Sequence, residues 1–74
     1  MAEETLDTLL DKLRPATLAE IAERCGLSLR ALADLRAGRV SDPRRATVIA
    51  LSLALKCTPS RVLAAIQASY DEQS

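Results

Sequence analysis

The 74-residue sequence contains no histidine, phenylalanine or tryptophan, and it has only one tyrosine, two cysteines and two glycines. Without large aromatic side chains, a hydrophobic core must be built mainly from Leu, Ala, Ile and Val, and Leu and Ala are among the strongest helix formers. Only two glycines and three prolines interrupt the chain. The composition therefore predicts one all-helical domain spanning residues 1–74.

The same absences argue against an enzyme. There is no histidine to act as a general base, and neither Cys25 nor Cys57 has an obvious catalytic partner, so both are interpreted as small buried apolar residues. The sequence has no glycine-rich phosphate loop, metal-ligand cluster or carboxylate pair with catalytic spacing. It also lacks a signal segment and an apolar run of the roughly 20 residues that cross a membrane. We expect a cytoplasmic protein with no cofactor, no metal and no small-molecule ligand.

The formal net charge is zero, but the charges are unevenly distributed. Residues 1–23 carry six acids and two bases, a net charge of −4, whereas residues 24–61 carry eight bases and two acids, a net charge of +6. Asp71 and Glu72 contribute −2 at the end. Phosphate responds to charge within a Debye length of about 8 Å, so the local excess is compatible with nucleic-acid binding. Ordinary solvated helix faces would give the same pattern, and charge alone does not decide.

Apolar spacing and capping residues predict three helices in the first half of the chain. The first covers about residues 4–14 and ends before Pro15, because proline disfavours helical backbone in the residue before it. The second, about 17–25, opens with a capping box between Thr17 and Glu20 and ends at Gly26. The third, about 28–37, is capped by Ser28. The predicted buried residues are Leu6, Leu9, Leu10, Leu13, Ile21, Ala22, Leu32 and Leu35.

Two more helices are predicted after a loop at residues 38–42. Asp42 is expected to cap the fourth helix, about 43–56, with Pro43 in the first position, where the missing amide costs nothing. This helix is apolar on most sides, so we expect it to be the most buried. Thr58 and Pro59 repeat the arrangement at the start of the fifth helix, about 59–70.

The second and third helices are separated by a tight turn with informative spacing. Ala22 is small enough for two helices to cross closely, Gly26 lies in the turn, and later leucines anchor the third helix. In these residues the sequence resembles the phage-repressor and Cro-like helix-turn-helix DNA-binding family. The resemblance implies a lambda-repressor-like five-helix fold in which helices 2 and 3 form the helix-turn-helix. It extends without a gap over Thr17 to Ser28, Leu32, Leu35, Gly38, Asp42, Pro43, Ala46 to Leu55 and Thr58 to Leu63.

The resemblance implies that the third helix enters the major groove of duplex DNA and contacts base edges. Arg30 is the one exposed position able to make a bidentate contact to guanine. Leu29 can pack on a thymine methyl, and Asp34 can accept from a cytosine amine. Since direct readout is sparse, we expect binding that depends on DNA shape, on a dimer or on a partner. The implied base-contact residues are Leu29, Arg30, Ala33 and Asp34.

The family also contacts DNA phosphates and often dimerises. The position usually held by a DNA-contacting glutamine is Leu18 here, a departure that removes a hydrogen bond. In the last helix, Leu63, Ile66 and Tyr70 are the possible homodimer interface, although they can equally close the core. The implied phosphate-contact residues are Thr17, Leu18, Arg39, Arg44 and Arg45.

The predicted function is sequence-specific binding of duplex DNA by a small, nucleoid-associated bacterial or phage transcriptional regulator, acting as a homodimer. The alternative is a protein-interaction module on the same fold, with little or no DNA binding. Such a module would act as an antirepressor, an antitoxin or a modulator of the transcription machinery. The neutral net charge, the acidic first helix and an apolar patch expected at Leu18 and Leu29 favour this alternative.

Overall fold

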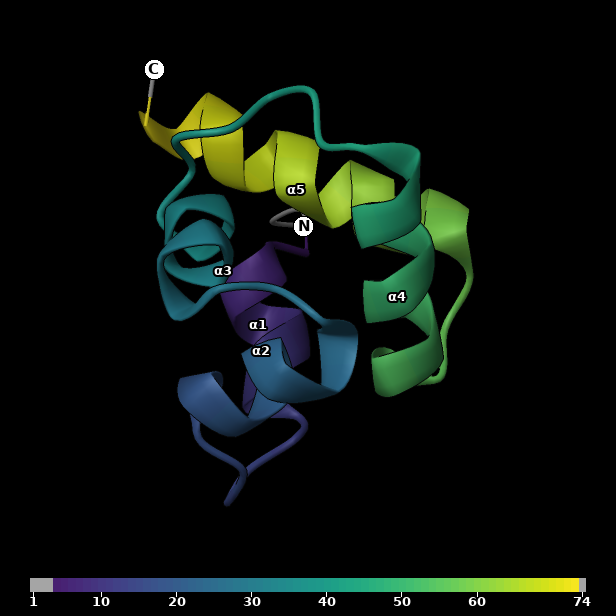
Figure 1. Ribbon diagram of the computed structural model, residues 1–74. Coiled ribbons are helices and arrows are strands. Elements are labelled where there is room, and N and C mark those ends of the chain that lie inside the picture. The colour runs from purple at the N-terminus through teal and green to yellow at the C-terminus, as the bar shows by residue number, and fades with distance from the viewer. Residues whose placement is uncertain (1–3, 74) are drawn as a thin grey trace.

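A computed structural model describes residues 4–73, so both ends of the predicted 1–74 domain lie outside the described part. The five helices are α1 (Leu6–Asp11), α2 (Leu18–Cys25), α3 (Leu29–Arg36), α4 (Arg45–Leu55) and α5 (Pro59–Gln73). Residues 4–73 contain no strand, and the all-helical prediction is confirmed. In Figure 1, α5 crosses the top of the molecule above α1, while α3 and α4 stand on either side and α2 lies below.

The caps of α2 and α3 form as predicted. The Thr17 hydroxyl accepts from the amide of Glu20, and the Glu20 carboxylate accepts from the amide of Thr17, both at 3.2 Å. Ser28 Oγ accepts from the amide of Ala31 at 3.0 Å. These side chains satisfy amides that have no partner within their helices, which fixes where each helix begins.

Within the described chain, α2, α3 and α4 end in the same geometry. Gly26, Gly38 and Lys56 follow them in the left-handed conformation, with φ of 68°, 79° and 55°. In each case the next amide donates to the carbonyl five residues earlier, over 2.9 to 3.0 Å. Glycine adopts this backbone freely, whereas a residue with a Cβ is strained by about 1 kcal/mol.

The first helix is shorter than the predicted 4–14. Thr5 caps it, with its hydroxyl accepting from the Thr8 amide at 3.4 Å, and the helix proper ends at Asp11. The amides of residues 12–14 donate to carbonyls three residues back, at 3.0 to 3.2 Å. This tighter winding turns the chain toward Pro15 before the proline itself is reached.

The fourth helix begins at Arg45, so the prediction that Asp42 caps it and Pro43 starts it is wrong. Arg44 occupies the cap position in extended conformation, with ψ of 145°, and makes no side-chain cap bond. Val40 packs against the core from the preceding loop. The chain then bends at Ser41 and Asp42 as it crosses from α3 to α4, as the loop in Figure 1 shows.

The relative burial of α4 and the length of α5 also differ from the predictions. Val48 and Leu51 are buried in α4, but Ile49 is 39% and Leu53 74% exposed, so this helix is not buried on most sides.

The fifth helix continues past the predicted residue 70 to Gln73. Residues 65, 66, 68 and 69 are all buried, so tertiary packing stabilises its later turns.

One hydrophobic cluster joins the five helices. The residues predicted to face inward in α1, α2 and α3 are buried, except that Leu13 is half-buried and packs against the cluster. None of the cluster's side chains is aromatic, as the composition requires. The cluster comprises Leu6, Leu10, Ile21, Ala22, Leu32, Leu35, Val48, Leu51, Val62 and Ile66.

Ser69 contacts both the start of α1 and the end of α3 from its place on α5. Ser69 Oγ accepts from the Leu6 amide at 2.9 Å and donates to the Ala65 carbonyl at 2.9 Å. Gly38, just beyond α3, lies so close to α5 that a Cβ at this position would overlap the Ser69 carbonyl oxygen. The beginning of α1 and the end of α3 therefore meet the same turn of α5.

An exposed ion-pair network holds Glu4 to α5 and to the turn after α1. Arg61 Nε and Nη2 donate to the two Glu4 carboxylate oxygens at 2.7 and 2.9 Å, and Lys12 Nζ donates at 3.1 Å. These hydrogen bonds, that of Arg61 first, lower the pKa of the Glu4 carboxyl from 4.5 to about 2.

Alanine at Gly38 should destabilise the protein much more than alanine at Gly26. Both glycines are left-handed, so each substitution costs about 1 kcal/mol of backbone strain. A Cβ at Gly26 meets open space, whereas one at Gly38 must displace α5, which adds about 1–3 kcal/mol. Urea unfolding followed by circular dichroism measures both free energies of unfolding. Equal losses for the two variants would contradict the close contact between Gly38 and Ser69.

Glu4→Gln should lower the thermal midpoint at neutral pH and have little effect near pH 2. Because the folded pKa of Glu4 lies below its ordinary value, the carboxylate's contribution is complete above about pH 4.5 and disappears as the pH falls toward 2. Added salt should reduce the contribution, since the network is exposed. Thermal melts of the parent and the variant across this range test it, with Glu72→Gln as the control for loss of one exposed carboxylate. A midpoint difference that persists unchanged at pH 2 would contradict the assignment.

Candidate nucleic-acid interface

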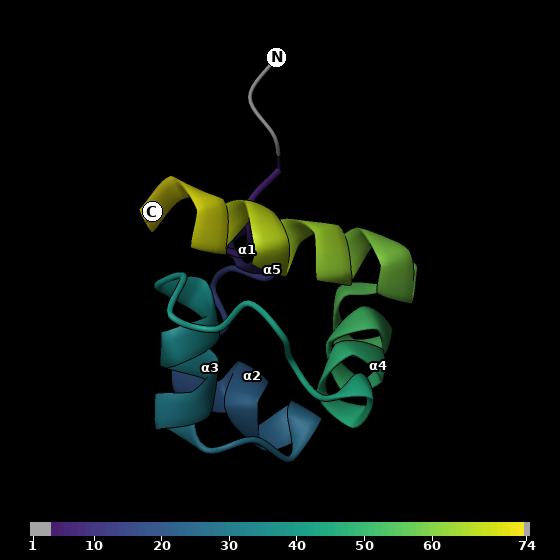
Figure 2. The same cartoon turned by 90° about the horizontal axis from the view of Figure 1, so that it is seen from above.

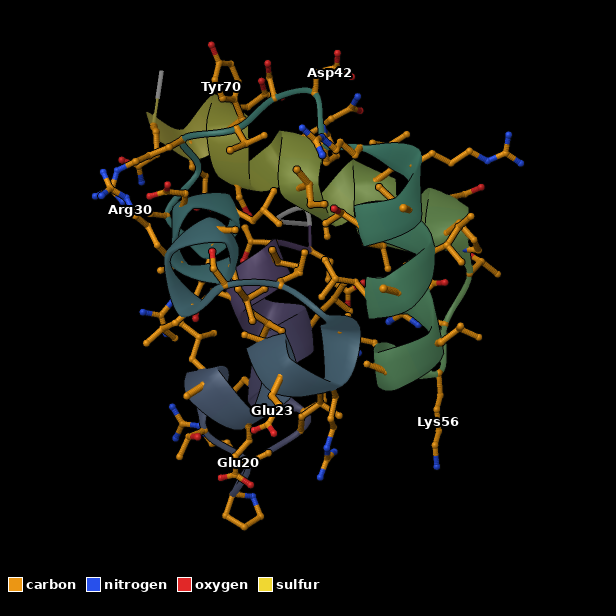
Figure 3. The ribbon with its side chains drawn as sticks, viewed as in Figure 1. Glu20, Glu23, Arg30, Asp42, Lys56 and Tyr70 are labelled. Atoms are coloured by element: carbon orange, nitrogen blue, oxygen red, sulfur yellow. The ribbon has the colours of Figure 1, made fainter. Side chains whose placement is uncertain are left out.

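The packing of α2 against α3 determines which side of α3 faces solvent. Ala22 of α2 and Leu32 and Leu35 of α3 are at most 4% exposed and belong to the core cluster. Only residues 26–28 separate the two helices. Since α3 is anchored by its leucines, its opposite side stays exposed, and Arg30 projects from the outer side of the helix (Figure 3).

The four predicted base-contact residues differ in their availability. Leu29 is 50% exposed and Arg30 is exposed, both in the first turn of α3. Arg30 forms no ion pair with any residue in the described range. Ala33 and Asp34, one turn later, are half-buried. The start of α3 therefore offers one free guanidinium beside one exposed leucine.

Asp34 and Arg39, which were predicted to contact a base and a phosphate respectively, are paired with each other. Arg39 Nη1 donates to Asp34 Oδ1 at 2.8 Å, with the two side chains 68% and 32% exposed. The left-handed Gly38 turns the chain back, and the Arg39 amide donates to the Asp34 carbonyl at 3.0 Å. This pairing was missed from the sequence, although the predicted helix end at Gly38 was the signal that could have revealed it.

The start of α4 carries two exposed cations, Arg44 and Arg45, which were predicted to contact phosphate. Neither is in an ion pair with a residue of the described chain, and the first turn contains no acidic residue. No side chain caps this helix, so its first amides point outward with the positive end of the helix dipole. Two cations at such an end do not stabilise the helix, but together with the amides they favour an anion.

The beginnings of α3 and α4 lie at one edge of the molecule, the lower edge of Figure 2. A surface hollow of about 340 Å³ separates them. Ala31, Asp34 and Leu35 line its α3 side, and Arg44 and Thr47 line its α4 side. Asp34 and Arg44, which were predicted to contact a base and a phosphate respectively, thus line the same hollow.

The remaining predicted contacts are less available. Thr17 is exposed, but its hydroxyl is engaged in the capping box with Glu20. Leu18 is half-buried and packs against the core, so of the expected apolar pair of Leu18 and Leu29 only Leu29 is exposed. Ile66 is fully buried and therefore closes the core instead of lining a surface.

Leu63 and Tyr70, the other two residues of the possible dimer interface, are 37% and 39% exposed on α5. They are seven residues apart, so they lie on one side of the helix. Figure 3 places Tyr70 at the top of the molecule, near the end of α5.

Of the six bases outside this region, three form ion pairs with nearby acids and three have none among the described residues. Arg14 pairs with Asp11, while Lys12 and Arg61 pair with Glu4. The exposed cations for which the described residues supply no ion pair are Arg24, Arg30, Arg36, Arg44, Arg45 and Lys56. Charge is therefore uneven in space as well as along the sequence.

The two cysteines are unpaired and half-buried. Cys25 Sγ donates to the Ala50 carbonyl at 3.8 Å, across the contact between α2 and α4. Burial raises the pKa of the Cys25 thiol, which disfavours the reactive thiolate. Cys25 and Cys57 both adjoin the core cluster, where they act as small apolar side chains.

Residues 4–73 contain no group of three or more Cys, Asp or Glu side chains arranged to hold a metal ion. No single described helix is long and apolar enough to cross a membrane, and α4 and α5 reach that length and apolarity only as a pair bent by 108°. Buried helices of globular folds give the same signal.

Comparison with protein-family models, with curated proteins and with solved structures finds no match to this chain.

Proposed function

We propose that this chain is a small transcriptional regulator of the phage-repressor and Cro-like kind, in which α2 and α3 form a helix-turn-helix that binds duplex DNA. The observation that supports the proposal is the set of unpaired cations at the beginnings of α3 and α4. Arg30 lies in the first turn of α3, Arg44 and Arg45 lie at the start of α4, and one hollow lies between the two helices. Bases around α1, by contrast, are paired with acids.

In this proposal the first turn of α3 enters the major groove, which is about 12 Å wide. The Arg30 guanidinium donates two hydrogen bonds to guanine, a contact worth about 1–3 kcal/mol of discrimination. Leu29, half-exposed beside it, packs against a thymine methyl. Ala33 is half-buried and Asp34 is held by Arg39, so recognition of the bases rests mainly on Arg30 and Leu29.

Phosphates bind at the beginning of α4. Arg44 and Arg45 supply two positive charges, and the uncapped amides of the first turn supply hydrogen-bond donors directed at the same anion. A phosphate there would satisfy amides that otherwise depend on water. These contacts position α3 but do not distinguish one sequence from another.

We further propose a homodimer on a two-fold operator, with Leu63 and Tyr70 of α5 as the contact surface. In such dimers the two half-sites lie one DNA turn, about 34 Å, apart. The alternative assignment is a protein-interaction module without DNA binding, and of the two leucines that favoured it Leu18 is half-buried against the core.

Arg30→Ala should reduce specificity more than general affinity, whereas Arg44→Ala should weaken binding to every sequence. Arg30 contacts a base in the proposed complex, and Arg44 neutralises a phosphate, so only the second change should reduce the salt slope, by about one unit. Selection from a random duplex library at about 100 mM salt, followed by affinities at several salt concentrations, measures both effects.

Lys56→Ala is the matched control, because it removes an unpaired cation at the opposite end of α4 from Arg44. It should leave both the selected motif and the salt slope unchanged. The proposal is supported if the parent chain enriches a palindromic DNA motif and the Arg30 variant enriches a less specific one. Equal losses on every sequence for the two arginine variants would refute the division of roles, and no enrichment or salt-dependent retention would refute DNA binding itself.

Asp34→Asn should tighten binding to all DNA sequences. The change removes a negative charge facing the DNA and frees Arg39, which can then neutralise one more phosphate and steepen the salt slope by about one unit. The same affinity measurements test this prediction. If the variant instead loses affinity for particular sequences only, Asp34 reads a cytosine amine as the sequence resemblance implied.

A further inference from the structure

The outer face of α4 carries an apolar ridge that the core does not use. Ala46, Ile49 and Leu53 follow one another at spacings of three and four residues, on the side of the helix opposite the buried Val48 and Leu51. Leu53 is the most exposed of the large apolar side chains described, at 74%, and Ile49 is 39% exposed. A single exposed leucine is ordinary, but a line of apolar side chains along a helix is a typical site for a partner helix.

Both ends of this ridge are positively charged. Arg45 lies one turn before Ile49, and Lys56 follows Leu53 at the end of the helix, where Figure 3 shows it projecting away from the molecule. Neither cation forms an ion pair with the described residues. No acidic residue occurs in the sequence between Asp42 and Asp71, so α4 and the start of α5 contain no anion.

The backbone at Lys56 is consistent with a use for its side chain. Lys56 takes the left-handed conformation that glycine takes after α2 and α3, with φ of 55°. Glycine would form the same turn without strain. A strained backbone at a residue other than glycine suggests a function for its side chain, and the Lys56 side chain extends the positive end of the ridge.

A second copy of the chain does not complement the ridge. Two α4 helices packed together around a two-fold axis bring like charges together in either direction. Antiparallel copies place Arg45 of each beside Lys56 of the other, and parallel copies place each cation beside its equivalent. The acids of α1 do not fit either. Asp7 and Asp11 are exposed, but the large apolar side chains of that helix are buried, so it offers no apolar side chain to pack on Leu53.

We propose that the α4 ridge, comprising Ala46, Ile49 and Leu53 between Arg45 and Lys56, binds an acidic amphipathic helix of another protein. The apolar side of that helix packs on Ile49 and Leu53, and its flanking carboxylates reach Arg45 and Lys56. This surface is separate from the outer side of α3, and the inference does not rest on DNA binding.

The probe is a synthetic helical peptide with leucines at i, i+3, i+4 and i+7 and glutamates at the flanking positions. A second peptide keeps the leucines and replaces every glutamate with lysine. Each is titrated into the ¹⁵N-labelled full-length chain, and amide shifts are followed by NMR. The acidic peptide should shift the amides of Ile49, Leu53 and Lys56, leave Glu20 and Glu23 of α2 unchanged, and bind more weakly as salt rises. The lysine peptide should not bind.

Leu53→Glu should weaken binding of the acidic peptide by about tenfold or more, because it places a like charge at the centre of the ridge. Lys56→Glu should also weaken it, and Lys56→Arg should restore it. Gln67→Glu, which adds one negative charge at an exposed position of α5, is the control and should have no effect. Circular dichroism and thermal melts of each variant separate loss of binding from loss of fold.

Three results would overturn the proposal. The first is equal binding of the acidic and lysine peptides, and the second is binding of the acidic peptide unchanged by Leu53→Glu. The third is self-association of the parent chain that Leu53→Glu abolishes, which would make a second copy the occupant. Failure of DNA selection leaves all of these measurements unaffected, so the two proposals fail independently.

Discussion

The hydrogen bond from the Leu6 amide to Ser69 is the contact on which the arrangement of the helices depends. It satisfies an amide at the start of α1 inside the core, where an unpaired one costs about 1–3 kcal/mol. Because the Ser69 hydroxyl also donates to Ala65, both of its roles are filled without water. Gly38 touches the backbone of the same residue. The end of α3, and with it the loop toward α4, is therefore positioned by α5 as well as by the core leucines.

Pairing of charges, more than their total, decides which surfaces remain available. Acids and bases near α1 satisfy one another, so a chain with zero net charge still has unpaired cations along α3 and α4. The two ends of α4 then differ in their surroundings. Its beginning faces α3 across a hollow lined by Arg44, whereas its last turns combine a cation with an exposed leucine. One helix thus presents two chemically distinct surfaces.

Features that depend on neighbouring residues could be predicted from the sequence, and features that depend on distant contacts could not. The capping box of Thr17 and the turn at Gly26 are local, and both formed as expected. Asp42 and Pro43 satisfied the same local rules but did not start α4, which begins only at Arg45, in a loop whose Val40 packs on the distant core. Among the candidate site residues, exposure of Arg30 followed from helix periodicity. The pairing of Asp34 with Arg39 required the direction of the chain after Gly38, and the DNA-binding role stays a proposal.

The absence of aromatic residues from the core has a practical consequence for spectroscopy. Tyr70 is the single aromatic residue of the chain, and it follows Ser69 on α5 at 39% exposure. Intrinsic fluorescence therefore reports from one site, beside the turn where α1, α3 and α5 meet. Loosening of that turn would change the emission while α2 and the start of α4 remained unseen. Tyr70 is therefore a natural fluorescence probe of the contact between α1, α3 and α5. A tryptophan introduced elsewhere would report separately on the rest of the fold.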